Sequence, residues 1–83
     1  MVRLRFFASL RETLGTGDEQ VELPGDITDI SALTAWLQAR NDRWHAALDN
    51  TRVRIAVNQT IVKPGHPVRD GDEVAWFPPV TGG

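Results

Sequence analysis

Both ends of the sequence alternate apolar and polar residues, and this pattern constrains the fold more than any other feature. Val2 to Phe7 and Glu73 to Phe77 each carry apolar side chains at every second position. A period of two indicates a β-strand with one face in the core and the other toward water. Because the two segments lie at opposite ends of the chain, we expect them to pair in parallel, with a helix crossing their apolar face.

The sequence between these strands predicts one main helix. Apolar residues recur at helical spacing from Ile30 to Ala39, with Thr28 or Asp29 as the expected N-cap. A shorter helix is expected from Ser9 to Leu14, capped by its first residue and stopped by Gly15. A strand is expected at Glu19 to Leu23, and a turn or short helix holds Trp44, Ala47 and Leu48. Two further strands, Arg52 to Val57 and Thr60 to Lys63, are joined by a turn at Asn58-Gln59.

This order of elements predicts an α+β fold. A strand, a short helix, a strand, a long helix and three further strands are typical of the ubiquitin-like β-grasp, a mixed sheet of about five strands packed on one main helix. Pro78-Pro79 ends the last strand, because proline cannot donate a hydrogen bond to a neighbouring strand. We therefore expect residues 1–77 to form the β-grasp domain and residues 78–83 to form a flexible C-terminal tail.

Length and composition exclude several classes of function. The 83 residues suffice for one small core, without a separate catalytic cleft. The sequence has no cysteine, which excludes disulfides and a catalytic thiol and leads us to expect a reducing, cytoplasmic location. A net charge of -2 argues against nucleic acid as a partner. The apolar runs are too short to cross a bilayer, so we expect neither a membrane anchor nor a signal peptide.

Alternation also places apolar side chains on the polar side of the sheet. Phe7, Ile61 and Phe77 fall on the same faces as charged residues of their strands, and the helix is expected to cover the opposite face. If the first, fourth and last strands are near neighbours, these three residues form an exposed apolar patch, which is typical of a partner surface. The alternative is that the strand ends twist these side chains under a loop. The arginines expected around the patch are Arg3, Arg5, Arg52 and Arg54.

The last residues of the sequence suggest a carboxyl terminus that itself reacts. Gly82 and Gly83 carry no side chain that would limit entry into a narrow active site or crowd attack on the terminal carbonyl. Extended, Pro78 to Gly83 would span about 20 Å, with the two prolines as a stiff base. The alternative is an unremarkable chain end, since small residues are common there.

The remaining polar clusters do not predict a metal or catalytic site. The acidic residues near Asp70 and Asp72 match a solvated β-turn better than a cation site. His45 and His66 have no third ligand nearby in the sequence, so we expect no bound metal. Arg11 is interpreted as part of a solvated helix face, with a partner contact as the alternative.

Three segments of the sequence resemble the molybdopterin synthase small-subunit family of sulfur carriers. The most specific is the C-terminal block from Asp70 to Gly83, which includes Phe-Pro-Pro-Val-Thr-Gly-Gly. Phe6 to Glu12 and Ala56 to Thr60 match less specifically, and the likeness runs from end to end. Trp76 departs from the pattern, because another aromatic residue is expected there.

The resemblance implies a chemistry centred on Gly83. An E1-like activating enzyme adenylates its carboxylate at the expense of ATP, and a persulfide-type donor converts the glycyl adenylate to a thiocarboxylate. The large synthase subunit then receives the tail, and the terminal sulfur attacks the cyclic pyranopterin monophosphate precursor to form the dithiolene. No cofactor is bound permanently, and the chain is not an enzyme by itself. The tail residues implied in this insertion are Pro78, Pro79, Val80, Thr81, Gly82 and Gly83.

The resemblance also implies the partners. The family's apolar docking patch corresponds to Phe7, Ile61 and Phe77, with Arg11 as a further contact, and the assembly is a heterotetramer with two large subunits at its centre. Two alternatives stay open: a sulfur carrier for another pathway, such as thiamine synthesis or tRNA thiolation, and a ubiquitin-like modifier joined to lysines through Gly83. A plain interaction module with an inert tail is a third.

Overall fold

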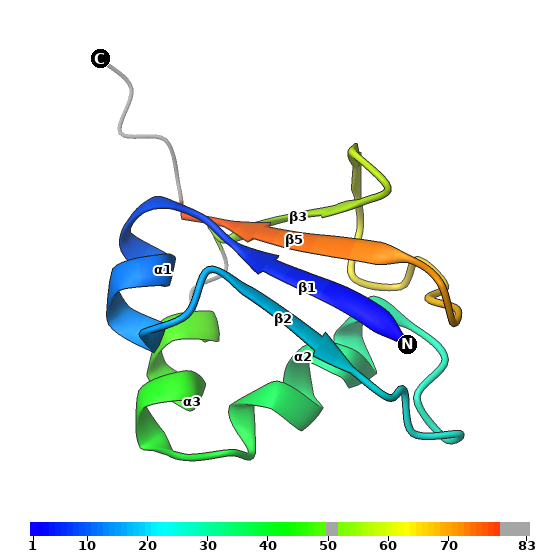
Figure 1. Ribbon diagram of the computed structural model, residues 1–83, viewed down its shortest axis with the longest axis horizontal. Helices are drawn as coiled ribbons and strands as arrows, with labels where there is room; N and C mark the ends of the chain where they lie inside the picture. The colour runs from blue at the N-terminus through cyan, green and yellow to red at the C-terminus, as the bar shows by residue number, and fades with distance from the viewer. Residues whose placement is uncertain (50–51, 79–83) are drawn as a thin grey trace.

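The computed structural model describes residues 1–49 and 52–78 of the chain. A five-stranded sheet forms one layer, and the helices pack against one of its faces (Figure 1). The elements are β1 (Val2–Phe6), α1 (Ala8–Leu14), β2 (Asp18–Val21), α2 (Ile30–Gln38), α3 (Asp42–Leu48), β3 (Arg54–Val57), β4 (Thr60–Val62) and β5 (Glu73–Phe77).

The strand order β2-β1-β5-β3-β4 confirms the predicted β-grasp topology. β1 and β5 pair in parallel at the centre, with Phe6 beside Trp76, and every other neighbouring pair is antiparallel. The hairpin between β3 and β4 turns at Asn58 and Gln59, whose φ angles of 50° and 72° are those of a type I′ turn. β3 lies between β5 and β4, so the first and last strands are direct neighbours and β4 lies one strand further from β5.

The buried core lies between the helices and the sheet. Trp76 is fully buried, stacks on Phe6 at 5.2 Å between ring centroids, and donates a hydrogen bond from Nε1 to Thr34 Oγ1 at 3.3 Å. Trp44 meets Phe6 edge-on, also at 5.2 Å. These aromatic contacts join α2, α3, β1 and β5 into one unit. Other fully buried side chains are Val2, Leu4, Ile30, Leu33, Leu37 and Val74.

Both α2 and α3 directly follow a residue whose side chain caps the helix N-terminus. Asp29 accepts a hydrogen bond from the backbone N–H of Ala32 at 2.8 Å, which selects Asp29 over Thr28 as the cap of α2. Asn41 caps α3 in the same way through the N–H of Trp44, at 3.0 Å.

The predicted cap of the first helix is wrong. Ser9 lies inside α1, which begins at Ala8 and has no side-chain cap. The reason is that the N–H of Phe7 still bonds to Trp76 O at 3.2 Å, so the helix begins directly after the sheet contact. The predicted stop is confirmed: Gly15 has a φ of 76°, a left-handed conformation that favours glycine.

No helix within the described residues is long and apolar enough to cross a membrane.

Candidate functional site

Two phenylalanines stack on the face of the sheet that the helices leave uncovered, here called the open face. Phe7 follows β1 directly, and Phe77 ends β5. Since β1 and β5 run in parallel with Phe6 beside Trp76, the next residues of both strands also meet. Their ring centroids lie 5.0 Å apart with 11° between the planes, and both side chains are half-buried. The alternation of the sequence predicts this placement.

Ile61 lies across a hollow from the two rings. Its side chain is 57% exposed, which is high for isoleucine in a folded domain. Ala56 separates it from β5, since Ala56 pairs with Ile61 on one side and with Ala75 on the other. The hollow measures about 300 Å³. Its lining residues are Arg5, Phe7, Ala56, Gln59, Ile61, Glu73, Ala75 and Phe77.

The floor of the hollow consists of two alanines that sequence reasoning did not single out. Ala56 and Ala75 are buried although they belong to the open face. Their methyl groups leave space that larger side chains would fill, so the surrounding phenylalanines and isoleucine form a concave surface rather than a flat one. The signal in the sequence was two alanines at open-face positions of paired strands. We call the set of Phe7, Ile61, Phe77, Ala56 and Ala75 the apolar patch.

Charged side chains border the apolar patch. The Arg5 guanidinium lies 5.1 Å from the Phe7 ring centroid, and its Nη1 lies 3.4 Å from Glu73 Oε1. Arg54 pairs with Phe77 in the β3–β5 register, so it lies beside the ring on the open face. Of the four arginines expected around the patch, only Arg5 lines the hollow itself.

Arg3 is engaged elsewhere on the open face. Its Nη2 and Nε donate hydrogen bonds to the Asp18 carboxylate at 2.7 and 3.2 Å. This hydrogen bonding, together with the charge attraction between the groups, raises the pKa of Arg3 and lowers the pKa of Asp18. The pair fastens the edge strand β2 to β1 and leaves Arg3 less available than Arg5 to a partner.

Arg11 does not belong to the hollow of the apolar patch. It lines a separate shallow depression beside α1, together with Gly17. A Cβ atom at Gly17 would lie 2.7 Å from Arg11 Nε, so the arginine side chain packs closely against this glycine and would have to shift to admit a larger residue. The structure therefore places the predicted contact residue Arg11 at a different location from Phe7, Ile61 and Phe77.

The tail begins at the edge of the apolar patch. Pro78, half-buried, follows Phe77 directly and is the last described residue. The predicted tail-insertion residues Pro79, Val80, Thr81 and Gly82, and the predicted reactive residue Gly83, lie outside the described residues.

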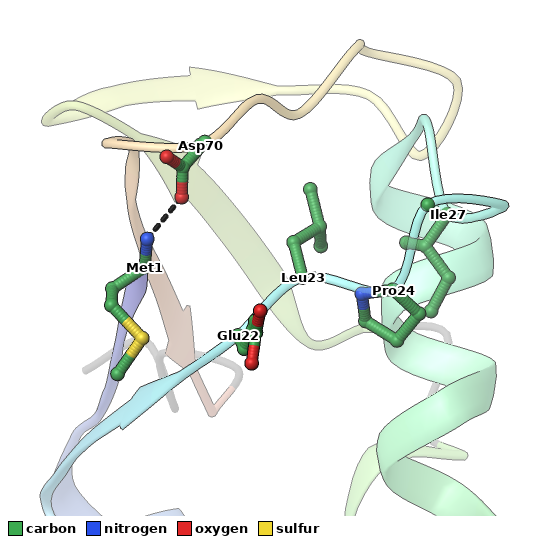
Figure 2. A pocket seen from close by; sticks show the side chains of 7 residues that line it. Met1, Glu22, Leu23, Pro24, Ile27 and Asp70 are labelled. Carbon is green, nitrogen blue, oxygen red and sulfur yellow. Dashed lines mark hydrogen bonds and ion pairs between the residues drawn. The ribbon is translucent and has the colours of Figure 1, made fainter.

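The acidic turn predicted from Asp70 and Asp72 is held by contacts within the protein. Asp70 forms an ion pair with the amino group of Met1 beside a second hollow, which Leu23, Pro24 and Ile27 also line (Figure 2). Asp72 accepts hydrogen bonds from Arg69 N and from Asn58 Nδ2. No group of three or more potential metal ligands is found among the described residues. Met1 precedes β1 and Phe7 follows it, so the hollow beside Met1 lies at the other end of β1 from Phe7.

Comparisons with known proteins agree with this architecture. The model of the ThiS family matches residues 4–83. The molybdopterin synthase sulfur carrier subunit of Escherichia coli is 47% identical over 83 residues, with all of both chains covered. The crystal structure of SAMP1 from Haloferax volcanii superposes with a TM-score of 0.75 at 27% identity, covering 99% of this chain and 98% of that one.

A solved complex is also similar. The protein–protein complex of subunits 1 and 2 of the molybdopterin-converting factor from Helicobacter pylori contains a chain that matches with a TM-score of 0.69 and 26% identity, covering 99% of this chain and 97% of that one. The fold is thus that of ubiquitin-like β-grasp proteins. The chain belongs to the ThiS family and is a member of the molybdopterin synthase sulfur carrier subunit family.

Proposed function

We propose that the chain is the sulfur carrier subunit of a molybdopterin synthase. The observation that carries this proposal is the apolar patch at the base of a Pro-Pro-Val-Thr-Gly-Gly segment, in a chain that matches a named sulfur carrier subunit over its full length. The patch docks the chain on the large subunit, and the tail carries the reacting group to that subunit's active site.

Gly83 carries the sulfur in this proposal. An E1-like enzyme joins its carboxylate to the AMP portion of ATP and releases pyrophosphate, because a free carboxylate is a poor electrophile. A persulfide donor then attacks the glycyl carbonyl and AMP leaves. A thiol cleaves the resulting acyl disulfide, which releases the thiocarboxylate and forms a disulfide with the donor.

The second half-reaction transfers the sulfur. The ionised thiocarboxylate is a strong nucleophile and attacks a carbon of the cyclic pyranopterin monophosphate precursor. A carbon–sulfur bond forms there as a carbon–oxygen bond of the same carbon breaks, and the displaced oxygen leaves as water or stays on the phosphate. Water then cleaves the bond between the glycyl carbonyl and sulfur, so the sulfur stays on the pterin product and Gly83 returns to a carboxylate. A dithiolene contains two sulfurs, so two loaded tails are consumed for each product.

The chain contributes no acid–base group to this reaction in our proposal. The open face presents apolar side chains and arginines, so the large subunit supplies the proton transfers and the phosphate-binding groups. Pro78 to Gly82 serve as the inserted segment, and Arg11 is a separate contact beside α1. Two carriers on two large subunits make the proposed heterotetramer. The adenylate and the sulfur on Gly83 are transient groups, and the reactions belong to the cytoplasm.

Intact mass spectrometry tests sulfur loading. The chain is incubated with its activating enzyme, ATP and a persulfide donor, and we expect a mass increase equal to the exchange of one oxygen for sulfur. A variant lacking Gly82 and Gly83 is the matched control, because its fold is retained and its reactive end is removed. An unchanged mass of the intact chain, with an activating enzyme that loads a known carrier in parallel, would sink the proposal.

A ubiquitin-like modifier is the second candidate function. The structural similarity to SAMP1, a small archaeal modifier protein, favours it. In that case Gly83 forms isopeptide bonds with lysines of other proteins. A modifier predicts adducts of the chain with other proteins that survive boiling in detergent and reducing agent, whereas a thiocarboxylate carrier predicts none.

A further inference from the structure

We propose that Arg5 and Arg54 select a partner whose docking face carries carboxylates around an apolar centre. This inference rests on the proposed function and names the chemistry of the partner surface. The two arginines, called here the arginine rim, lie beside the two stacked phenylalanines of the apolar patch. A partner must therefore match both the apolar hollow and the positive charge next to it.

Arg5 is only partly satisfied by contacts within the chain. Among residues 1–49 and 52–78, its one ion pair, to Glu73, is long at 3.4 Å, and its buried Nε has no hydrogen-bond partner. A guanidinium has five N–H donors, so most of the donors of Arg5 are unused. The Phe7 ring holds the guanidinium in position at the edge of the hollow, which lowers the entropy lost when a second carboxylate binds it.

Within the described residues, the Arg54 side chain makes fewer polar contacts than that of Arg5. It is exposed, and within the described part of the chain it forms no ion pair or hydrogen bond through its side chain. It lies opposite Phe77 in the sheet register, on the side of the ring pair away from β1. The two arginines therefore flank Phe77 and Phe7 from different strands, β1 and β3.

The charge of the rim contrasts with the charge of the whole chain. The sequence carries a net charge of -2, yet Arg5 and Arg54 both lie beside the phenylalanine pair, and Glu73 is the carboxylate that lines the hollow with Arg5. Arg3, the next arginine of β1, is already matched by Asp18. The positive excess is thus local to the place where the tail begins, and it fits a negatively charged docking face.

The partner that fits this surface is a large synthase subunit that presents an apolar side chain to the hollow and acidic residues on either side of that side chain. Arginine and carboxylate groups form paired hydrogen bonds of defined geometry, so the rim fixes orientation as well as charge. Orientation matters here, because the tail leaves from Pro78, next to Phe77, and must enter one particular pocket.

Binding measurements with the large subunit from the same organism test the rim. We expect the double variant Arg5→Gln, Arg54→Gln to bind about tenfold more weakly or worse, and Arg54→Gln alone about threefold more weakly. Rising salt should weaken binding of the natural chain more than binding of the double variant, because salt screens exposed charges. Arg43→Gln is the matched control, since this exposed arginine belongs to α3 on the covered side of the sheet.

The outcomes separate this inference from the proposed function. If the natural chain binds the large subunit, and the double variant binds as tightly with the same salt dependence, the arginine rim has no role while the carrier function stands. If the natural chain neither binds the large subunit nor gains sulfur, the proposed function itself fails. Arg54→Gln guards against a folding artefact, because Arg54 is exposed, and thermal melting of each variant checks directly that the fold is retained.

Discussion

The same two strands build an aromatic stack on each face of the sheet, and the two stacks differ in their surroundings. On the helix-covered face Phe6 stacks on Trp76 at 5.2 Å, and on the open face Phe7 stacks on Phe77 at 5.0 Å. Phe6 and Trp76 are almost fully buried, whereas Phe7 and Phe77 are half-buried. Neighbouring residues of one strand thus serve two purposes: the inner stack holds the domain together, and the outer stack is available to a partner.

The comparison teaches that burial, rather than residue type, distinguishes the aromatic residues of the core from those of the proposed docking surface. α2 and α3 cover Trp76 and Phe6, so their apolar area is removed from water by folding itself. Nothing in the described residues covers the outer pair to the same degree. Its remaining apolar area is removed from water only when another protein binds.

The largest expected effect comes from breaking the inner stack. Trp76→Ala removes a fully buried ring, its contact with Phe6 and its hydrogen bond to Thr34. A large-to-small change of this kind costs about 3–5 kcal/mol, a large share of the stability of a small domain. Urea unfolding followed by circular dichroism should show a much lower midpoint or no folded baseline. A variant as stable as the natural chain would show that the covered face is not the core.

Breaking the outer stack should affect binding instead of folding. Phe77→Ala removes the central ring of the apolar patch, and we expect docking on the large subunit to weaken by about 2–3 kcal/mol, as at interface hot spots. The loss in folding stability should stay at about 1–2 kcal/mol, because an aromatic pair contributes about 1 kcal/mol beyond its area burial and Phe77 is only half-buried. Calorimetric titration and urea unfolding of the same sample measure both quantities. Unfolding of this variant would mean that Phe77 belongs to the core.

A third variant adds side-chain volume to the open face instead of removing a ring from it. Ala75→Leu adds side-chain volume on the floor of the hollow, between Phe77 and Ile61, without removing any contact. We expect the leucine to occupy the space of the partner's apolar side chain and docking to weaken by about 1–3 kcal/mol, by analogy with the cost of overpacking a protein core. Unchanged affinity, measured by the same titration, would show that the partner does not enter the hollow.

The smallest expected effect concerns the edge of the open face. The lowered pKa of Asp18 means that its carboxylate is stabilised in the folded state by Arg3. Its contribution to stability is therefore present above the ordinary pKa of 3.8 and is lost as the pH falls through the lower folded value. Asp18→Asn should melt slightly below the natural chain near neutral pH, and the difference should vanish in acid. A difference that persists or grows in acid would rule out this ion pair as its source.

The sequence predicted that Phe7 and Phe77 lie on the open face and that the end strands pair in parallel, but it did not predict that the aromatic rings stack. It did not predict the order of β3 and β4, since strand order depends on which long-range pairs form and not on local pattern. The helix caps were also predicted only in part. Asp29 was one of the two expected caps of α2, whereas Ser9 does not cap α1, because Phe7 bonds to β5 and the helix begins directly after it.

The hollow of the candidate site was predictable only in part. Phe7, Ile61 and Phe77 were visible as apolar residues on a polar face, but the hollow between them depends on two alanines that β3 brings together with β5. The partial pairing of Arg5 with Glu73 likewise needs side-chain positions. Arg11 could not be separated from the patch by sequence alone, because α1 and the β2 loop jointly set its direction.

Single-turnover sulfur transfer tests the central claim most directly. The chain with a thiocarboxylate on Gly83 is mixed with the large subunit and the cyclic pterin precursor, and both the pterin product and the mass of the chain are followed. We predict that the dithiolene product appears as Gly83 returns to a carboxylate, and that a chain extended beyond Gly83 still docks but yields no product. Sulfur that remains on Gly83 in the presence of saturating, active large subunit would contradict the account, as would transfer by the extended chain.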